Sequence, residues 1–344
     1  VQKLQKNKKM NNETNSLTTL PRQKQNAEEI IEAGTRREIP AFIEANTSAI
    51  SLAELNERCI VPSFADLSPT ISHANFASIV RQAANNIFAN DTFSDIEFRV
   101  SHQINGRTPD ALNIPAKNLK ANQITTFYQR FCFCFEIPTQ TNNINGQDVS
   151  LVVGGLRSLH ETNLYSKKSP EKFRIFIGYR VHVCSNMMLT CDGLSEKLEC
   201  MTEADIFQHA MMLFSRFNKE KTLSELEFLS KTTMTTEQFC QFIGKCRLYA
   251  ALSDYQRREL NLPQILLGDS LLNAATRGFV TNPNFGVNGT DMISCWQLMQ
   301  LLNDAARQSY IDVWADRNRN ATDISIGIQK ARRVEDDSYS WFIN

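Results

Sequence analysis

The chain has 344 residues, of which 42% are hydrophobic, so it can bury a sizeable core in one large domain or two modest ones. Its formal charge is zero, from 37 basic and 37 acidic residues, so any attraction for nucleic acid or anionic lipid must come from local clusters. No window approaches the roughly 20 apolar residues that span a bilayer, and no apolar leader opens the chain. These features exclude disorder throughout, argue against a dedicated DNA-coating protein, and predict a soluble, cytoplasmic protein with no membrane partner.

The nine cysteines are scattered through apolar segments such as residues 131–135. An odd number of single cysteines in such surroundings is typical of reduced core thiols and not of a disulfide framework. Neither Cys-x-x-Cys nor His-Glu-x-x-His occurs in the sequence, so we expect no metal site.

Residues 1–26 are dominated by Lys, Gln, Asn and Thr, and they offer too little apolar area to offset the entropy lost on ordering. They predict a disordered arm. A short helix is expected over residues 27–34, followed by an apolar segment around Phe42 and Ile43. Apolar residues at near-helical spacing then predict a helix from about Ser72 to Ala89.

A strand region follows, because apolar and polar residues alternate over residues 95–101 and again over 127–137. In the second run the five apolar residues share one face: Phe127, Phe131, Phe133, Phe135 and Ile137. The positive-φ chemistry of Asn145-Gly146 predicts an antiparallel hairpin to a strand over 149–153, through a connection longer than two residues. A fourth strand is expected from Phe173 to Val183, with Val183 on its apolar side, and a short fifth over 187–191.

After Gly193 the period becomes helical. Capping pairs at Thr202 with Asp205 and at Thr235 with Gln238 each precede an apolar stripe. Further helices are expected around residues 270–276, 294–306 and 322–331, with the three tryptophans in the core: Trp296, Trp314 and Trp341.

This order of elements predicts an α+β fold, in which an antiparallel sheet over about residues 95–192 is backed by helices and the C-terminal half is mainly helical. The domain organisation we expect is the arm 1–26, a sheet-containing region 27–193, and a helical region 194–344 packed on the sheet, the last two forming one continuous globular unit.

Basic residues are dense between Arg157 and Arg180, a segment that contains six Lys or Arg residues and two acidic ones, Glu161 and Glu171. Arg99 and Arg130 fall on the polar faces of their strands. If these faces coincide, together with Tyr128 and His182, they form a cationic platform suited to phosphates and splayed bases. The candidate nucleic-acid or phosphate-binding residues are Arg99, Arg130, Arg157, Lys167, Lys168, Lys172, Arg174 and Arg180. The alternative is that the arginines pair with acids on a solvated face, namely Asp95, Glu97, Glu136 and Asp148.

No complete catalytic signature is present, and the sequence identifies no cofactor. Gly154-Gly155 occurs outside any phosphate-loop motif and is typical of a bulge or tight bend at a strand end. His102, His160 and His182 are candidate general bases, but none accompanies a nucleophile in a recognised local frame.

Several strings carry a family resemblance: FIEANT from Phe42, RVSH from Arg99, GGLR, NLYSKKSPEKF, the FIGY run ending in CSN, and SYIDVWADRNRNAT. They resemble a bacterial family of gut anaerobes known as domain of unknown function 3871, over nearly everything from about Pro40 to Asn344. The middle of the chain is similar in layout to phage- and plasmid-like proteins. The resemblance implies a mobile-element or phage-derived setting, and it supplies no activity or catalytic residue.

Three functions remain open. The first is binding of single-stranded DNA or RNA without catalysis, through the basic sheet surface. The second is an enzyme acting on a nucleotide or phosphorylated substrate, with the lysine loop as a phosphate clamp and a histidine or carboxylate as acid or base. The third is a protein-binding regulator. A deep cleft that collects His102 or His182 with an acid favours the enzyme, and a long open groove favours strand binding.

Overall fold

The computed structural model describes residues 40–61, 70–101, 103–111, 113–162, 169–333 and 338–344. All of the described residues belong to one compact unit, Ile39–Asn344. The predicted arm 1–26 and the predicted helix 27–34 lie outside the described residues.

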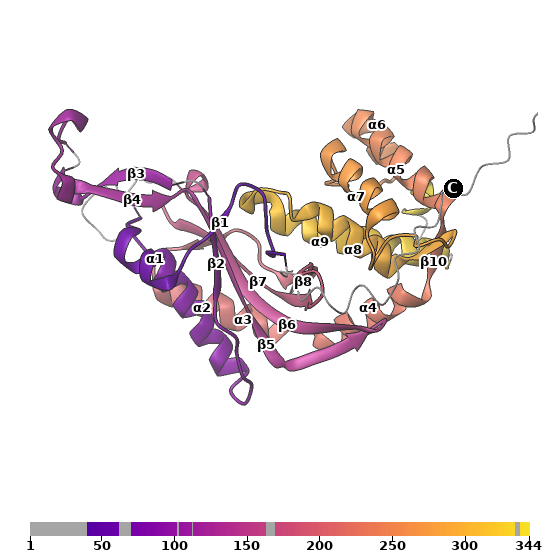
Figure 1. The fold of residues 1–344 in the computed structure, drawn as a ribbon, viewed down its shortest axis with the longest axis horizontal. Coiled ribbons are helices and arrows are strands. Elements are labelled where there is room, and N and C mark those ends of the chain that lie inside the picture. The colour runs from indigo at the N-terminus through magenta and orange to yellow at the C-terminus, as the bar shows by residue number, and fades with distance from the viewer. Residues whose placement is uncertain (1–39, 62–69, 102, 112, 163–168, 334–337) are drawn as a thin grey trace, which may run out of the picture. The chain divides into compact units, whose positions relative to one another are not determined.

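The centre of the described unit is an antiparallel sheet in the order β1-β2-β5-β6-β7-β8, with β9 also pairing with β7 (Figure 1). Its strands are β1 (Ser48–Ala49), β2 (Glu97–Val100), β5 (Arg130–Ile144), β6 (Gln147–Ser158), β7 (Glu171–Val181), β8 (Met187–Leu194) and β9 (Leu198–Cys200). Every pairing is antiparallel. The predicted α+β class with an antiparallel sheet is confirmed.

Both faces of this sheet are covered. On one face the phenylalanines of β5 pack against α2 (His73–Ile87), while α3 (Glu203–Arg216) lies beside α2 and packs on β7 and β8. On the other face α9 (Ile311–Arg332) crosses the strands, and Trp314 lies edge-on between Phe42 and Phe176, with ring centroids 5.7 and 5.6 Å away. Alternate residues of the central strands are therefore buried on opposite sides of the sheet, as the period of two requires.

The capping pairs in the sequence start helices where expected. Ser72 accepts a hydrogen bond from the backbone of Asn75 at the start of α2, and Thr202 and Thr235 form capping boxes at α3 and α5. The remaining helices are α1 (Leu52–Arg58), α4 (Lys219–Lys231), α5 (Thr236–Ala251), α6 (Asp254–Glu259), α7 (Asp269–Thr281) and α8 (Cys295–Ala306). The sequence reading missed α1, α4 and α6, and it started α9 at residue 322 instead of Ile311.

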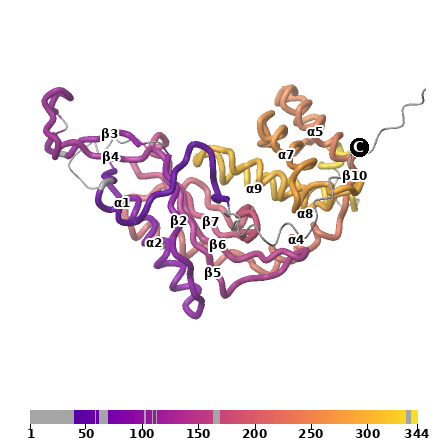
Figure 2. The backbone as a smooth tube through the Cα atoms, in the orientation of Figure 1, coloured from indigo at the N-terminus to yellow at the C-terminus, as the bar shows by residue number. Residues whose placement is uncertain are grey.

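Three details of the strand prediction are wrong. Phe127 lies in β4 (Ile124–Tyr128), which pairs with β3 (Gln103–Arg107) in a separate hairpin that projects from the sheet (Figures 1 and 2). The β5–β6 loop is the two residues Asn145-Gly146, at φ 52° and 76°, because Ile144 pairs with Gln147. β7 ends at Val181, and Val183 is 51% exposed.

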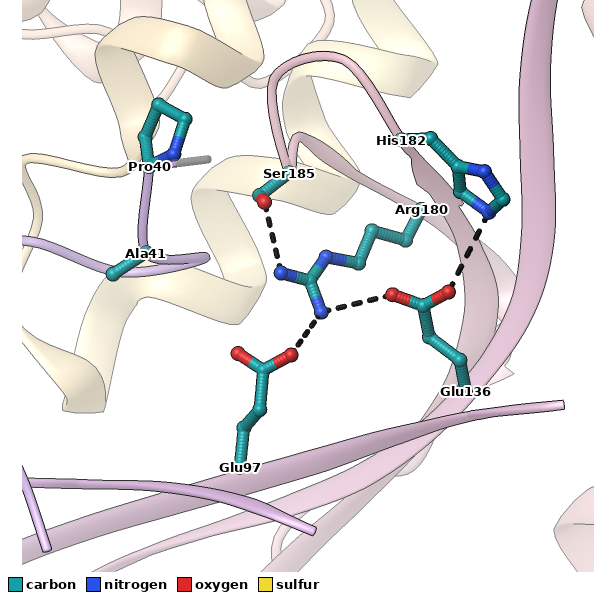
Figure 3. A pocket seen from close by; sticks show the side chains of 7 residues that line it. All are labelled: Pro40, Ala41, Glu97, Glu136, Arg180, His182 and Ser185. Atoms are coloured by element: carbon teal, nitrogen blue, oxygen red, sulfur yellow. Dashed lines mark hydrogen bonds and ion pairs between the residues drawn. The ribbon is translucent and has the colours of Figure 1, made fainter. Parts of the chain in front are cut away.

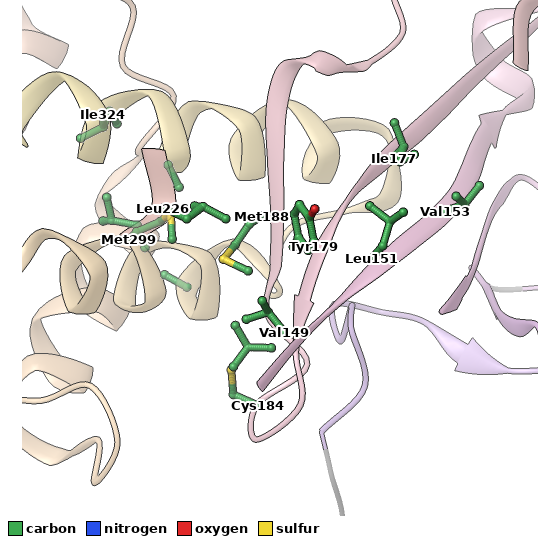
Figure 4. Packing of buried hydrophobic residues seen from close by; sticks show 14 of the residues in the cluster. Val149, Leu151, Val153, Ile177, Tyr179, Cys184, Met188, Leu226, Met299 and Ile324 are labelled. Carbon is green, nitrogen blue, oxygen red and sulfur yellow. The ribbon is translucent and has the colours of Figure 1, made fainter. Parts of the chain in front are cut away.

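The hydrophobic core continues from the sheet into the helices that follow it. Figure 4 shows Tyr179 and Met188 of the sheet meeting Leu226 of α4, Met299 of α8 and Ile324 of α9. A short antiparallel pair, β10 (Thr233–Thr235) with β11 (Met292–Ser294), joins the starts of α5 and α8. Within the described ranges no helix is both long and apolar enough to cross a membrane.

Packing at Gly154 of β6 leaves no room for a side chain. A β-carbon there would lie 2.2 Å from the Phe133 carbonyl oxygen and 2.4 Å from the Phe176 ring. Because a backbone atom must move, we expect Gly154→Ala to lower the free energy of unfolding by about 3 kcal/mol. Gly244→Ala, in the open middle of α5, is the control and should stabilise by about 0.5–1 kcal/mol. Urea titrations of both variants measure this, and equal effects would contradict the packing.

The buried His73 predicts a pH dependence of stability. Its ring stacks on Phe131 with centroids 4.5 Å apart, and burial, followed by repulsion from Arg157, lowers its pKa from 6.5 to about 3. The unfolded chain therefore takes up a proton at this residue below pH 6.5 while the folded protein does not. This residue's contribution to stability is lost as pH falls from 6.5 towards 3, by up to about 1.4 kcal/mol per pH unit. His73→Phe keeps the stacked ring without the titration, so urea titrations between pH 7.5 and 5 should show a shallower loss in the variant; identical pH slopes would refute this.

Candidate functional site

The register places four of the predicted cations on one face of the sheet: Arg99, Arg130, Arg174 and Arg180. Lys172 shares their parity on β7. Arg157 lies on the opposite face, because it pairs with Phe131. Lys167 and Lys168 lie outside the described residues, as does His102.

The arginines are held by acids, by Thr47 or by backbone carbonyls, and each is buried or half-buried. Arg174 makes a bidentate pair with Asp316 of α9 at 2.7 and 2.9 Å. Burial acts to raise the pKa of the Asp316 carboxyl, but the hydrogen bonds and charge of Arg174 outweigh burial and hold the pKa below its usual value. Arg130 lies 3.2 Å from Asp312 and over the ring of Tyr310.

The other cations are held in the same way. Arg157 is buried, bonds Glu171, and donates to the Ile71 carbonyl at 2.6 Å. Arg99 donates three bonds to Thr47, and Lys172 lies 3.8 Å from Glu199. Tyr128 lies in the separate β3–β4 hairpin. The described cations of the predicted platform are thus partly gathered on one face, but α9 covers part of that face and each of these cations is held by an acid, by Thr47 or by a backbone carbonyl.

A pocket of about 560 Å³ opens on the same face, beyond the part that α9 covers (Figure 3). It is lined by Pro40, Ala41, Glu97, Glu136, Arg180, His182 and Ser185. Strands β2, β5 and β7 supply its floor, and the turn between β7 and β8 supplies one wall.

Arg180 organises this pocket. One of its terminal nitrogens contacts both carboxylates, Glu97 and Glu136, the latter at 3.0 Å, while the other donates to Ser185 Oγ at 2.8 Å. Burial acts to lower the pKa of Arg180, but the surrounding negative groups outweigh it and raise the pKa above the usual value. The guanidinium is therefore a fixed internal cation whose donors face protein groups.

His182 stands at the edge of the pocket and is 41% exposed at its side chain. Its Nε2 lies 2.5 Å from Ser150 Oγ and 3.5 Å from Glu136 Oε2. Since both partners face the same nitrogen, Glu136 does not hold the ring from behind, and Ser150 is fully buried against Thr141. This is not the arrangement of an activated serine; it is a histidine and a carboxylate placed side by side at a cavity.

The β7–β8 turn is held by α8 and by Arg307, the residue that follows this helix. Arg307 donates to the Cys184 carbonyl at 2.9 Å, and the Asn186 amide donates to Gln300. Ser185, at φ 58°, adopts the left-handed conformation that turns its hydroxyl onto Arg180. The sequence reading named the charged groups of this pocket but missed Ser185, whose only signal is a short polar turn after a strand.

The sequence predicted a strand end at Gly154-Gly155. This prediction is wrong, because both glycines lie inside β6. Both are covered by aromatic rings, from Phe176 on one face and from Phe76 and Phe133 on the other. They serve close packing and offer no approach for phosphate. Among the described residues, no three His, Cys, Asp or Glu side chains are grouped as metal ligands.

Fold and site together define an α+β protein whose antiparallel sheet is covered on both faces and carries a polar pocket on one of them. The chain belongs to the family described as "Domain of unknown function, B. Theta Gene description (DUF3871)", which matches residues 23–343. The predicted family is confirmed. No curated protein and no solved structure matches the chain. The looser likeness to phage- and plasmid-like proteins stays a prediction.

Removal of Arg180 should leave two carboxylates without their counterion. A fully buried pair loses about 3–5 kcal/mol when one partner is removed, and because Glu97 and Glu136 retain some water we expect about 2 kcal/mol for Arg180→Met. Arg247→Met, which breaks an exposed pair with Asp269, is the matched control and should stay within about 0.5 kcal/mol. Adding Glu136→Gln to Arg180→Met should restore part of the loss. Thermal or urea unfolding decides, and equal stability of the two single variants would contradict the role of Arg180.

Proposed function

We propose that the protein binds a small polar ligand, neutral or cationic, in the pocket around Arg180, and that His182 and Glu136 exchange protons with it. The supporting observation is that Glu97, Glu136 and His182 border one cavity, and that Arg180, the one arginine among its described lining residues, is already bonded to protein groups. A cleft that collects a histidine with an acid is the feature that favours small-molecule chemistry over strand binding.

The charge of the pocket selects the ligand. Among the described lining residues, two carboxylates stand against one guanidinium that they already engage, and this arrangement disfavours an entering anion. Glu97 is 47% exposed at its side chain, which leaves carboxylate lone pairs for an ammonium, amide or hydroxyl donor. This argues for an amine or a hydroxyl-bearing compound over a nucleotide or a phosphorylated substrate.

The acid and the base of the pocket are adjacent. His182 Nε2 and Glu136 Oε2 lie 3.5 Å apart, so a proton on the ligand can pass to either group when the ligand is within hydrogen-bonding distance. A buried arginine beside Glu136 keeps the carboxylate in place during such an exchange.

Single-stranded DNA or RNA binding has weaker support. Within the described part of the chain, the arginines of the expected platform are held by Asp312, Asp316, Glu97 and Glu136 or by backbone, and a phosphate backbone must displace those contacts. That function then rests on Lys167 and Lys168, which lie outside the described residues. Among the described residues, no contact gives particular support to a mobile-element origin, a phosphorylated substrate or a regulatory role.

Ligand titration tests the proposal. Calorimetry or NMR titration with a panel of primary amines, guanidines and polyols should give binding, whereas inorganic phosphate, nucleotides and oligo(dT) should bind more weakly. Glu97→Gln should weaken amine binding about tenfold, since a charge-assisted hydrogen bond contributes about 1.5–3 kcal/mol. Asp269→Asn, an exposed acid paired with Arg247 outside the pocket, is the matched control and should change nothing.

Two outcomes would overturn this function. One is tighter binding of phosphate or oligo(dT) than of every amine and polyol, with a steep fall in added salt. The other is amine binding that Glu97→Gln and Asp269→Asn affect equally.

A further inference from the structure

A second group of side chains lies on the same sheet face, at the other end of β5 and β6. Ser158 ends β6, His160 follows in the short 3-10 helix Leu159–Glu161, and Asp312 lies in the first turn of α9. Arg130, at the start of β5, pairs with Ser158 across the sheet and reaches the same carboxylate. None of these residues lines the Arg180 pocket.

The two nitrogens of His160 face different partners. Nδ1 lies 2.6 Å from Ser158 Oγ, and Nε2 lies 3.8 Å from Asp312 Oδ2. Arg130 fixes that carboxylate at 3.2 and 3.3 Å. A hydroxyl, an imidazole and an acid therefore stand in series, with the imidazole between the other two.

This order differs from the arrangement at the pocket, where Ser150 and Glu136 share one nitrogen of His182. In a series arrangement the acid holds the ring while the opposite nitrogen takes the proton of the hydroxyl, and such groups are recognised by geometry and not by sequence position. The 3.8 Å contact between His160 and Asp312 is longer than a hydrogen bond, and catalytic contacts of this kind often tighten only when substrate binds.

We propose that Ser158 is a nucleophile for small acyl groups, with His160 as its general base and Asp312 as the positioning residue. The Ser158 oxygen attacks the carbonyl carbon of an ester, and its proton passes to His160 Nδ1. The bond to the leaving alkoxide then breaks, and the alkoxide takes that proton from His160. Water, deprotonated by the same nitrogen, hydrolyses the acyl-serine and restores the hydroxyl.

The surroundings set the class of substrate. Ser158 is only 2% exposed, while the side chain of its neighbour His160 is 40% exposed, so a substrate meets the histidine before the hydroxyl. Because so little of Ser158 is exposed, the proposal is limited to small acyl groups, of acetyl size. Asp312 is already paired with Arg130, so a neutral ester suits the site better than a charged one.

The experiment uses the full chain with p-nitrophenyl acetate as the probe. Release of nitrophenol is followed by absorbance, and the acetylated residue is mapped by mass spectrometry after a short reaction. We expect acetyl on Ser158, no turnover in Ser158→Ala, and a fall of about 100-fold or more in His160→Gln. Asp312→Asn should lose most of the rate, and Asp312→Glu should recover part of it.

Controls keep the result decisive. Ser325→Ala removes another buried serine, whose hydroxyl donates to the Ala321 carbonyl within α9, and should leave the rate unchanged. If Ser158→Ala fails to fold, Ser158→Cys is used with iodoacetamide, and its alkylation should depend on His160. Absence of acetyl on Ser158, or a rate that His160→Gln leaves unaltered, means that the Ser158 to His160 contact is a local hydrogen bond only and overturns the proposal.

Discussion

The covering of both faces of the sheet is the constraint on which the other features of the molecule depend. An arginine on a strand that is open to water needs no protein partner. An arginine beneath a helix loses its hydration, at a cost of several kcal/mol, unless a carboxylate takes the place of the water. α9 supplies such carboxylates one turn apart, Asp312 for Arg130 and Asp316 for Arg174. The helix that covers this face of the sheet therefore also neutralises two of its arginines. Strand alternation suggested a cationic surface here, but the structure has a layer of ion pairs between the sheet and α9.

Local features of the fold could be read from the sequence because their causes are local. Strand alternation, the Asn145-Gly146 turn and the capping pairs each act within a few residues, and all appear in the structure. The first half of α9 could not be read in this way. Its apolar stripe stops after Ile311, Trp314 and Ala315. Asp316 and Asn320 follow, and the partners of these polar groups lie on other elements. The β3–β4 hairpin was missed because the alternation is too continuous. It runs without a break through Gln129, although the chain there passes from the two-stranded sheet of β4 to the main sheet of β5.

The candidate pocket was predictable in composition but not in geometry. Alternation put Glu97, Glu136 and Arg180 on the polar side of their strands, which is correct, whereas His182 lies just past the end of β7. Their contacts join residues far apart in the chain, 83 positions for Arg180 with Glu97 and 142 for Arg174 with Asp316. No pattern in a single sequence reports which strands are neighbours or which helix covers them, so the choice between an open platform and a neutralised layer required the fold.

The two histidine sites show how the same residue types acquire different chemistry from small differences of placement. At the pocket, one nitrogen of His182 faces both its serine and its acid, which suits proton exchange with a ligand in the cavity. At the far end of the sheet, His160 uses both nitrogens, which suits activation of the Ser158 hydroxyl. In each site an arginine expected to bind phosphate holds the acid instead, Arg180 for Glu136 and Arg130 for Asp312, because a largely buried charge needs a counterion. The basic residues thus support both sites as counterions of Glu136 and Asp312, and the groups left to meet a ligand are the histidines and carboxylates beside them.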